Sequence, residues 1–222
     1  KFYTKNKNNY LIVLERNDYS CARLTVFKII YSDTVKLIKK SSKYLKFLRD
    51  PQDFTIIKNK IIFMDTLNRR LVLTSINAKL LSFINLDSVT NNKKILCKSI
   101  FVSKDSNIFI CDFDNLIIYK FNKNFKFIKI IDYNLSKQKY KKLRAFYTDK
   151  SKQIFLTRHD KRISVKFKNK KITNIDYSKQ TGFPVQNPTE INFFNNKFYI
   201  ADKENDRIII TDKNLNFKNE IS

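Results

Sequence analysis

Acidic, amide and guanidinium side chains recur in this chain at one spacing, Asp-x-x-Asn-x-Arg, between two apolar runs. The two full copies are Asp65, Asn68 and Arg70, and then Asp202, Asn205 and Arg207. Carboxylates that recur around a central channel could hold a divalent metal ion, because Ca²⁺ and Mg²⁺ prefer oxygen ligands. A metal-dependent hydrolase or lyase built in this way also needs a general acid or base close to the ion.

Histidine, the most frequent general base, occurs once, as His159 in the charged segment TRHDKR. That setting favours an exposed side chain, and no Ser-His-Asp set can be composed from the sequence. The motif also repeats, whereas an active site is needed only once. We therefore expect a structural turn, in which Asp accepts backbone N–H groups, Asn adopts a left-handed conformation and Arg pairs with an Asp. The expected protein has no catalytic residue, bound metal or cofactor.

A longer repeat surrounds these turns. The segment PQDFTIIKNKIIFMDTLNRRLVL, which begins at Pro51, aligns without a gap with PTEINFFNNKFYIADKENDRIII, which begins at Pro188. Three weaker copies keep part of the pattern: Asp112 and Asn115 with Ile117 in the Arg position, Arg158 and Arg162 with Arg158 in the Asp position, and Glu15 and Arg23 at the two ends of a longer turn. Five units of about 46 residues therefore fill the chain.

Each unit has the periodicity of short strands separated by polar turns. Apolar runs of strand length end in pairs such as Asn59-Lys60, and four such runs make an antiparallel meander. Repeated meanders of this length predict an all-β protein, a β-propeller with five recognisable four-stranded blades in a single domain. The expected blades cover residues 1–46, 47–90, 91–135, 136–182 and 183–222.

The repeat resembles the NHL family of propeller repeats. The resemblance rests on the proline near the first strand and on the apolar-x-Asp-x-x-Asn-x-Arg-apolar core in the two full copies. The chain departs from that family in its turns, where Asn and Asp replace the usual glycines, and in its five units, since the family commonly closes with six. We expect a degenerate or truncated six-bladed type, with a five-bladed ring as an alternative.

The composition allows a single packed domain and leaves the compartment open. The 222 residues are 42% hydrophobic, and no apolar run approaches the length of a membrane span. The chain starts at Lys1, so a targeting peptide is either removed or not included, and both an extracytoplasmic and a cytoplasmic location remain possible. Three cysteines without paired spacing are expected to be buried fillers: Cys21, Cys97 and Cys111.

The net charge of +25 has two explanations. It favours a nucleic-acid or other polyanion partner, but a lysine-rich and asparagine-rich composition with one glycine also indicates codon bias in an AT-rich genome. Because strand direction alternates, the Asp turns and the loops between blades should lie at one end of the sheets. That end collects the predicted binding residues: Lys39, Lys40, Lys43, Tyr44, Lys46, Lys93, Lys94, Lys137, Lys139, Tyr140, Lys141, Lys142 and Arg144.

Two functions follow for that face. The first is a non-catalytic platform for other protein subunits, which is the more general use of propellers. The alternative is RNA or another polyanion, because Tyr44 and Tyr140 lie between lysines and could stack on bases. Some NHL propellers bind single-stranded RNA on such a face, so the resemblance permits this partner. A metal-dependent propeller hydrolase or lyase is the least favoured function.

Overall fold

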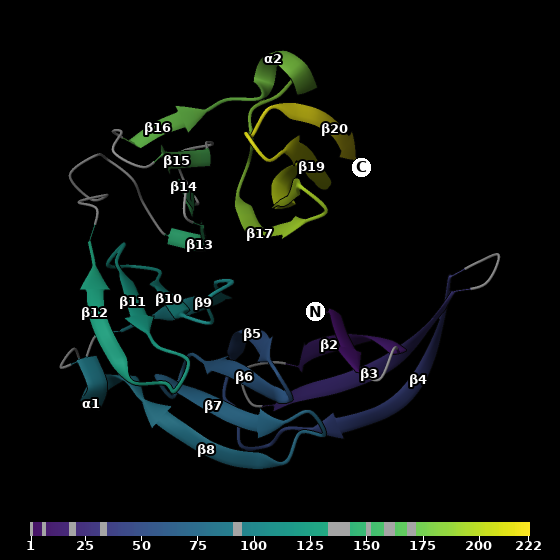
Figure 1. The fold of residues 1–222 in the computed structure, drawn as a ribbon, viewed down its shortest axis with the longest axis vertical. Helices are drawn as coiled ribbons and strands as arrows, with labels where there is room; N and C mark the ends of the chain where they lie inside the picture. Colours follow the sequence, from purple (N-terminus) through teal and green to yellow (C-terminus); the bar gives the residue numbers. More distant parts are fainter. Residues whose placement is uncertain are drawn as a thin grey trace. The chain divides into compact units, whose positions relative to one another are not determined.

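The computed structural model describes residues 2–5, 8–17, 21–31, 35–90, 95–132, 143–149, 152–157, 163–167 and 172–222. They form five four-stranded antiparallel sheets, and each sheet is a meander of consecutive strands (Figure 1). The chain divides into two compact units, Lys1–Ile95 and Leu96–Ser222, which we describe separately.

The first unit contains two sheets. The strands of the first sheet are β1 (Phe2–Lys5), β2 (Asn8–Asn17), β3 (Cys21–Tyr31) and β4 (Val35–Tyr44). The strands of the second are β5 (Pro51–Ile57), β6 (Lys60–Asp65), β7 (Arg70–Ser75) and β8 (Leu80–Asn85), followed by the short helix α1 (Leu86–Thr90). Ile12 and Leu24 of the first sheet share one buried cluster with Phe54, Phe63 and Val72 of the second. The two meanders therefore pack on a common core.

The second unit contains the other three sheets. The third sheet is formed by β9 (Cys97–Val102), β10 (Ile108–Asp112), β11 (Ile118–Phe121) and β12 (Phe127–Ile131). The fourth is formed by β13 (Leu143–Thr148), β14 (Lys152–Thr157), β15 (Ile163–Phe167) and β16 (Ile172–Ile175), followed by α2 (Ser178–Thr181). The fifth is formed by β17 (Pro188–Phe194), β18 (Lys197–Asp202), β19 (Arg207–Asp212) and β20 (Phe217–Ile221), with the 3₁₀ turn η2 (Lys203–Asn205) after β18.

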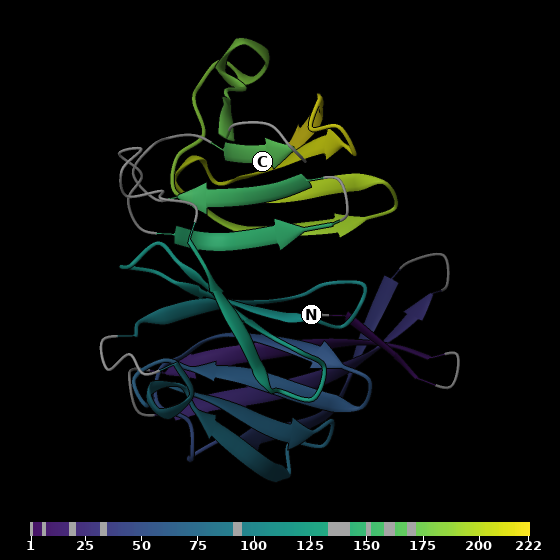
Figure 2. The ribbon, with the colours of Figure 1, turned by 60° about the vertical axis from the view of Figure 1, so that its left-hand side comes forward.

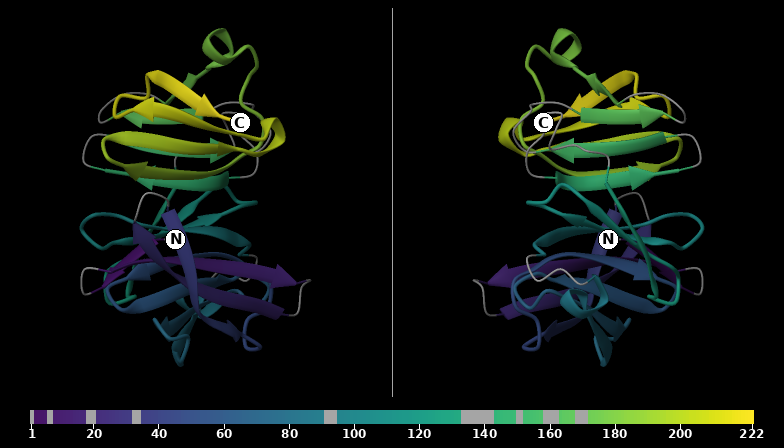
Figure 3. Two further views of the ribbon diagram at one scale, coloured as in Figure 1. Left: turned by 90° about the vertical axis from the view of Figure 1, so that its right-hand side faces the viewer. Right: turned by 90° about the vertical axis from the view of Figure 1, so that its left-hand side faces the viewer.

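Within a sheet, the second strand is more buried than the fourth, which we call the outer strand. Every residue of β10 is buried, and β6 is buried from Ile61 to Asp65, as expected for strands packed on both faces. The fourth strands, in contrast, are largely exposed along β8 and β12. In the fifth sheet the strands run side by side from β17 to β20 (Figure 2, Figure 3). Among the strands whose burial is described, the second strands β6 and β10 are therefore hidden, and the fourth strands β8 and β12 are exposed to solvent.

The turns contain many left-handed residues although the chain has one glycine. Asn195 and Asn196 connect β17 to β18 with φ of 47° and 58°, and Asp50 and Asn187 precede the two repeat prolines with φ of 51° and 49°. Asn and Asp therefore take left-handed positions at these four sites, as the sequence predicted, but other residue types such as Lys58, Ala78 and Phe125 do so elsewhere. In the Asp-x-x-Asn-x-Arg motif the prediction was wrong by one residue. The left-handed position belongs to the residue after the Asn: Arg69, Leu116 and Asp206.

Candidate functional site

The Asp65 turn connects three segments of the first unit. One oxygen, Oδ1, accepts the backbone N–H of Arg49 at 2.6 Å, and the other, Oδ2, accepts Asn68 Nδ2 at 2.9 Å and Arg70 Nε at 2.8 Å. Arg70 also donates to the carbonyl of Phe47 at 2.6 Å. The motif therefore joins its own hairpin, β6 to β7, to the connection that enters the sheet.

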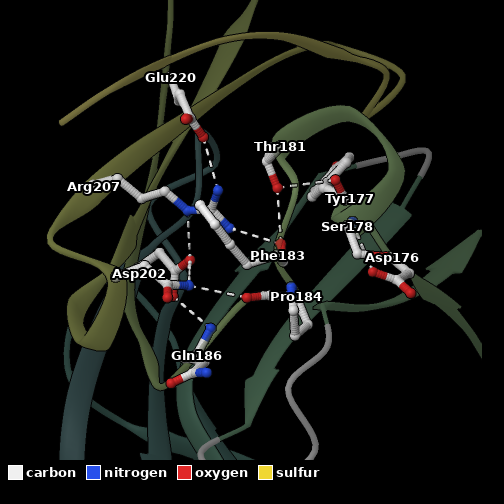
Figure 4. Close-up of polar contacts among 11 residues, drawn as sticks. Asp176, Tyr177, Ser178, Thr181, Phe183, Pro184, Gln186, Asp202, Arg207 and Glu220 are labelled. Atoms are coloured by element: carbon white, nitrogen blue, oxygen red, sulfur yellow. Dashed lines mark hydrogen bonds and ion pairs between the residues drawn. The ribbon is translucent and has the colours of Figure 1, made fainter.

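The Asp202 turn repeats this arrangement in the second unit (Figure 4). Oδ1 accepts the backbone N–H of Gln186 at 2.6 Å, while Oδ2 accepts Asn205 Nδ2 at 2.7 Å and Arg207 Nε at 2.9 Å. Arg207 donates further to the carbonyl of Phe183 and to Glu220, at 3.1 Å and 2.8 Å. In both units the backbone donor lies sixteen residues before the Asp. The repeat seen in sequence is thus a repeat of one hydrogen-bond network.

The weaker copies keep less of this network. Asp112 accepts the N–H of Asn115 and its side-chain amide, and Ile117 contributes only its backbone. Glu15 and Arg23 are direct cross-strand partners in β2 and β3 and form an ion pair.

The fourth sheet corrects one expectation about the repeat. Leu143 pairs with Thr157, as Pro51 pairs with Asp65 and Pro188 with Asp202. Thr157 therefore occupies the position that Asp65 and Asp202 occupy in the full copies, one residue before Arg158. The three sheets share this register, since a bulge follows Leu143 just as one follows each proline.

These contacts favour a structural function for the motif. In both full copies each carboxylate oxygen already accepts at least one hydrogen bond. Among the described residues no group of three or more His, Cys, Asp or Glu could hold a metal ion. His159 lies outside the described residues.

The two cysteines whose side chains are described behave as small buried residues. Cys97 and Cys111 are buried, as the sequence predicted. Burial raises the pKa of the Cys97 thiol well above its ordinary value, and nearby Asp112 raises it further. A thiol that stays protonated is a weak nucleophile. Burial therefore disfavours the reactive thiolate form of Cys97.

Hydrogen bonds support the expectation that Asp turns and the connections between sheets share one end. The backbone N–H of Leu67, in the Asp65 turn, donates to the carbonyl of Arg49, and that of Leu86 donates to Arg69. In the second unit Phe113 donates to Leu96 and accepts from Leu143. Each Asp turn thus contacts the connection before its sheet, and the Asp65 and Asp112 turns also contact the connection after it. We call the end of a sheet that carries its Asp turn the turn end.

Four predicted binding residues have described side chains. Lys43, Tyr44 and Lys46 are exposed around the end of β4. Arg144, at the start of β13, lies over the ring of Phe113 with its Cζ 4.8 Å from the centroid. All four lie at the turn end of a sheet, although Lys43 and Tyr44 are the last part of β4 and not of a loop. Their function in binding stays a prediction.

The other predicted residues are corrected or remain untested. Lys39 and Lys40 were expected in a connecting loop, but they lie within β4, four or five residues before its end, hence about 15 Å from the turn end. The remaining ones lie outside the described residues: Lys93, Lys94, Lys137, Lys139, Tyr140, Lys141 and Lys142.

Sequence reasoning missed two residues of this surface in the first unit. Leu67 is 40% exposed and lies inside the Asp65 turn, and Arg49 is exposed beside it. Tyr44 is 54% exposed at the other end of the same connection. We define the turn-end surface as these five residues: Lys43, Tyr44, Lys46, Arg49 and Leu67. An apolar residue inside the repeated polar turn was the signal available in the sequence.

Similar solved structures share the fold at very low sequence identity. Streptogramin B lyase matches 76% of this chain with a TM-score of 0.55 and 12% identity. The chain spans about half the length of that lyase, 53%. One chain in the structure of the nidogen/laminin complex matches 91% of this chain over 76% of its own length, with a TM-score of 0.62 and 10% identity. YCF48 bound to D1 peptide matches 84% of this chain and 60% of its own, with a TM-score of 0.55 and 6% identity.

These neighbours and the repeated meanders define the class of the protein, which is a β-propeller, as predicted. No protein-family profile matches the chain, so the NHL family stays a resemblance. No characterised protein matches it in sequence. In the described part of the chain no helix is long and apolar enough to cross a membrane.

Proposed function

We propose that this protein is a non-catalytic interaction module that binds another protein through the turn end of its sheets. The turn-end surface of the first unit carries the proposal. It presents to solvent the apolar side chains of Tyr44, at the end of β4, and Leu67, in the Asp65 turn. The Asp65 network joins this turn to the connection that follows β4. Exposed apolar groups supported by a rigid scaffold are typical of protein-binding surfaces.

The charges of this surface indicate the chemistry of the partner. Lys43, Lys46 and Arg49 are exposed, and they form no ion pair with another described residue. Arg69, in contrast, is paired with Asp87 in the same unit. A partner with carboxylates around an apolar centre would therefore complement the surface.

The neighbouring structures give limited support. Two of them are complexes with a protein or peptide, nidogen with laminin and YCF48 with D1 peptide, and another is a lyase. At 12% identity or less the likeness concerns the fold, so neither activity carries over by itself. Nothing in the comparisons supports RNA, and most of the lysines on which that alternative depends lie outside the described residues.

The test uses the full chain as bait. Partners captured from the source organism by crosslinking are identified, and one is purified and titrated against the double variant Tyr44→Ser, Leu67→Ser. We expect the Kd to rise about tenfold or more, because buried aromatic and apolar anchors carry most of the binding energy at an interface.

The matched control is the double variant Leu80→Ser, Leu81→Ser, which removes two exposed apolar side chains from β8 of the same unit. It should bind the partner like the original chain. Equal binding by the Tyr44 and Leu67 variant, or equal losses in both variants, would contradict the proposal.

A further inference from the structure

The outer strand of the third sheet carries a second surface, distinct from the turn-end surface. β12 is the last strand in the order β9, β10, β11, β12, and it lies at the edge of its sheet in Figure 1. Ile128 and Ile130 are 45% and 46% exposed, and Lys129 between them is exposed as well. Since successive side chains of a strand alternate, the two isoleucines lie on one face and Lys129 on the other.

Lysines are placed unfavourably along the β11–β12 hairpin. Lys120 and Lys129 are direct cross-strand partners, and like charges in such positions destabilise a sheet. Lys120 is partly compensated, since its Nζ lies 5.7 Å from the Phe109 ring centroid. It is also close enough to Asp105 to contribute to the lowered pKa of that carboxyl, which is caused first by its hydrogen bond from Ser103.

Three lysines of the hairpin lack such compensation. Lys123, Lys126 and Lys129 are exposed and form no ion pair within the described part of the chain. The hairpin therefore presents an apolar pair and one lysine on its edge strand, with two further lysines in the adjoining turn.

We propose that β12 is a docking strand for an extended acidic segment of another protein, which adds a fifth strand to the third sheet. An edge strand offers one row of unpaired backbone groups, and an added strand is held by main-chain hydrogen bonds. Carboxylates of the added strand would lie opposite Lys129 and near Lys126. Apolar residues at alternate positions would cover Ile128 and Ile130.

Two other exposed outer strands, β8 and β20, lack this combination within their bounds. The strand β8 has exposed apolar residues but no charged residue from Leu80 to Asn85. In β20, Lys218 is followed by Glu220, which pairs with Arg207. Edge lysines also discourage sheet-to-sheet aggregation, and a single lysine is enough for that purpose. The Lys120–Lys129 pair adds a repulsion that an anionic partner strand would reduce.

The test uses a fluorescein-labelled peptide of about ten residues that alternates glutamate with valine, a length that spans a strand. Binding to the full chain is measured by fluorescence anisotropy. We expect Lys129→Glu to weaken binding about tenfold, because one attractive cross-strand pair becomes repulsive. The double variant Ile128→Thr, Ile130→Thr should weaken it similarly, and the same peptide with alternate backbone nitrogens methylated should not bind.

Lys218→Glu is the matched control, because it removes an exposed lysine from another outer strand, β20, with the same change of net charge. Its binding should stay within about twofold of the original, since only long-range attraction changes. Equal weakening by Lys129→Glu and Lys218→Glu would show general attraction to a basic protein and overturn the proposal. Unchanged binding of the methylated peptide, or no binding of the unmethylated one, would overturn it as well.

Discussion

At the scale of single residues, one carboxylate connects three segments of backbone in each full repeat. Asp202 is fully buried and Arg207 is 2% exposed at its side chain, and the guanidinium is further held by Glu220 and the carbonyl of Phe183. A buried ion pair is retained where its remaining donors and acceptors are satisfied, because each unpaired charge would be costly. The network therefore works as an internal clamp between the connection and the hairpin.

The clamp predicts a large cost for Asp202→Asn. In the variant, Glu220 is the only carboxylate left beside the Arg207 guanidinium. The new amide N–H₂ group also faces groups that donate hydrogen bonds to Asp202 in the original chain. We expect the free energy of unfolding, measured with urea, to fall by about 3 kcal/mol, at the lower end of the cost of breaking a buried pair.

Glu15→Gln is the control for this variant. It changes the corresponding Glu15–Arg23 pair, in which both side chains are exposed to solvent. It should leave the urea midpoint unchanged, because exposed pairs contribute little. A comparable loss in both variants would show that burial does not set the strength of the clamp.

At the scale of elements, the hairpin turns use residues other than glycine in left-handed conformations. Asn195 and Asn196 form the two-residue connection between β17 and β18, and both have positive φ. Two positive φ values in a two-residue hairpin define a type I′ turn, whose twist matches that of the strands. Asn tolerates this conformation better than other non-glycine residues, but glycine has no Cβ to strain it.

We therefore expect Asn196→Gly to stabilise the hairpin. The free energy of unfolding should rise by about 0.5 kcal/mol, since relief of strain is partly offset by the greater freedom of glycine in the unfolded chain. Asn192→Gly, at an exposed position inside β17, is the control and should lower it by about 0.5–1 kcal/mol. Stability changes of the same sign in both variants would contradict the turn assignment.

At the scale of the whole molecule, five copies of one meander carry a formal net charge of +25. A net charge far from zero destabilises a compact state through self-repulsion. The 45 Lys and Arg residues outnumber the 20 Asp and Glu residues by more than two to one, so each positive charge has more positive than negative neighbours on average. Screening by salt should then stabilise the folded chain.

We expect the urea midpoint to rise when sodium chloride is increased from about 0.05 M to about 0.3 M, where the Debye length falls well below 10 Å. A triple variant, Lys123→Glu, Lys197→Glu and Lys213→Glu, changes exposed lysines and lowers the net charge by six, from +25 to +19. Its salt dependence should be smaller. A midpoint that falls with salt would mean that surface ion pairs outweigh the repulsion.

The sequence by itself determined the all-β class, the meander and the repeated turn. The propeller blade is predictable because strand alternation and the Asp-x-x-Asn-x-Arg spacing act over a few neighbouring residues, as the Asp65 and Asp202 networks show. The tertiary structure decided which residue turns left-handed, that Thr157 takes the Asp position, and that Lys39 and Lys40 lie within a strand. It also decided that Leu67 and Ile128 are exposed. These features depend on bulges, strand ends and burial, which are set by contacts between segments far apart in sequence. A local sequence pattern does not specify those contacts.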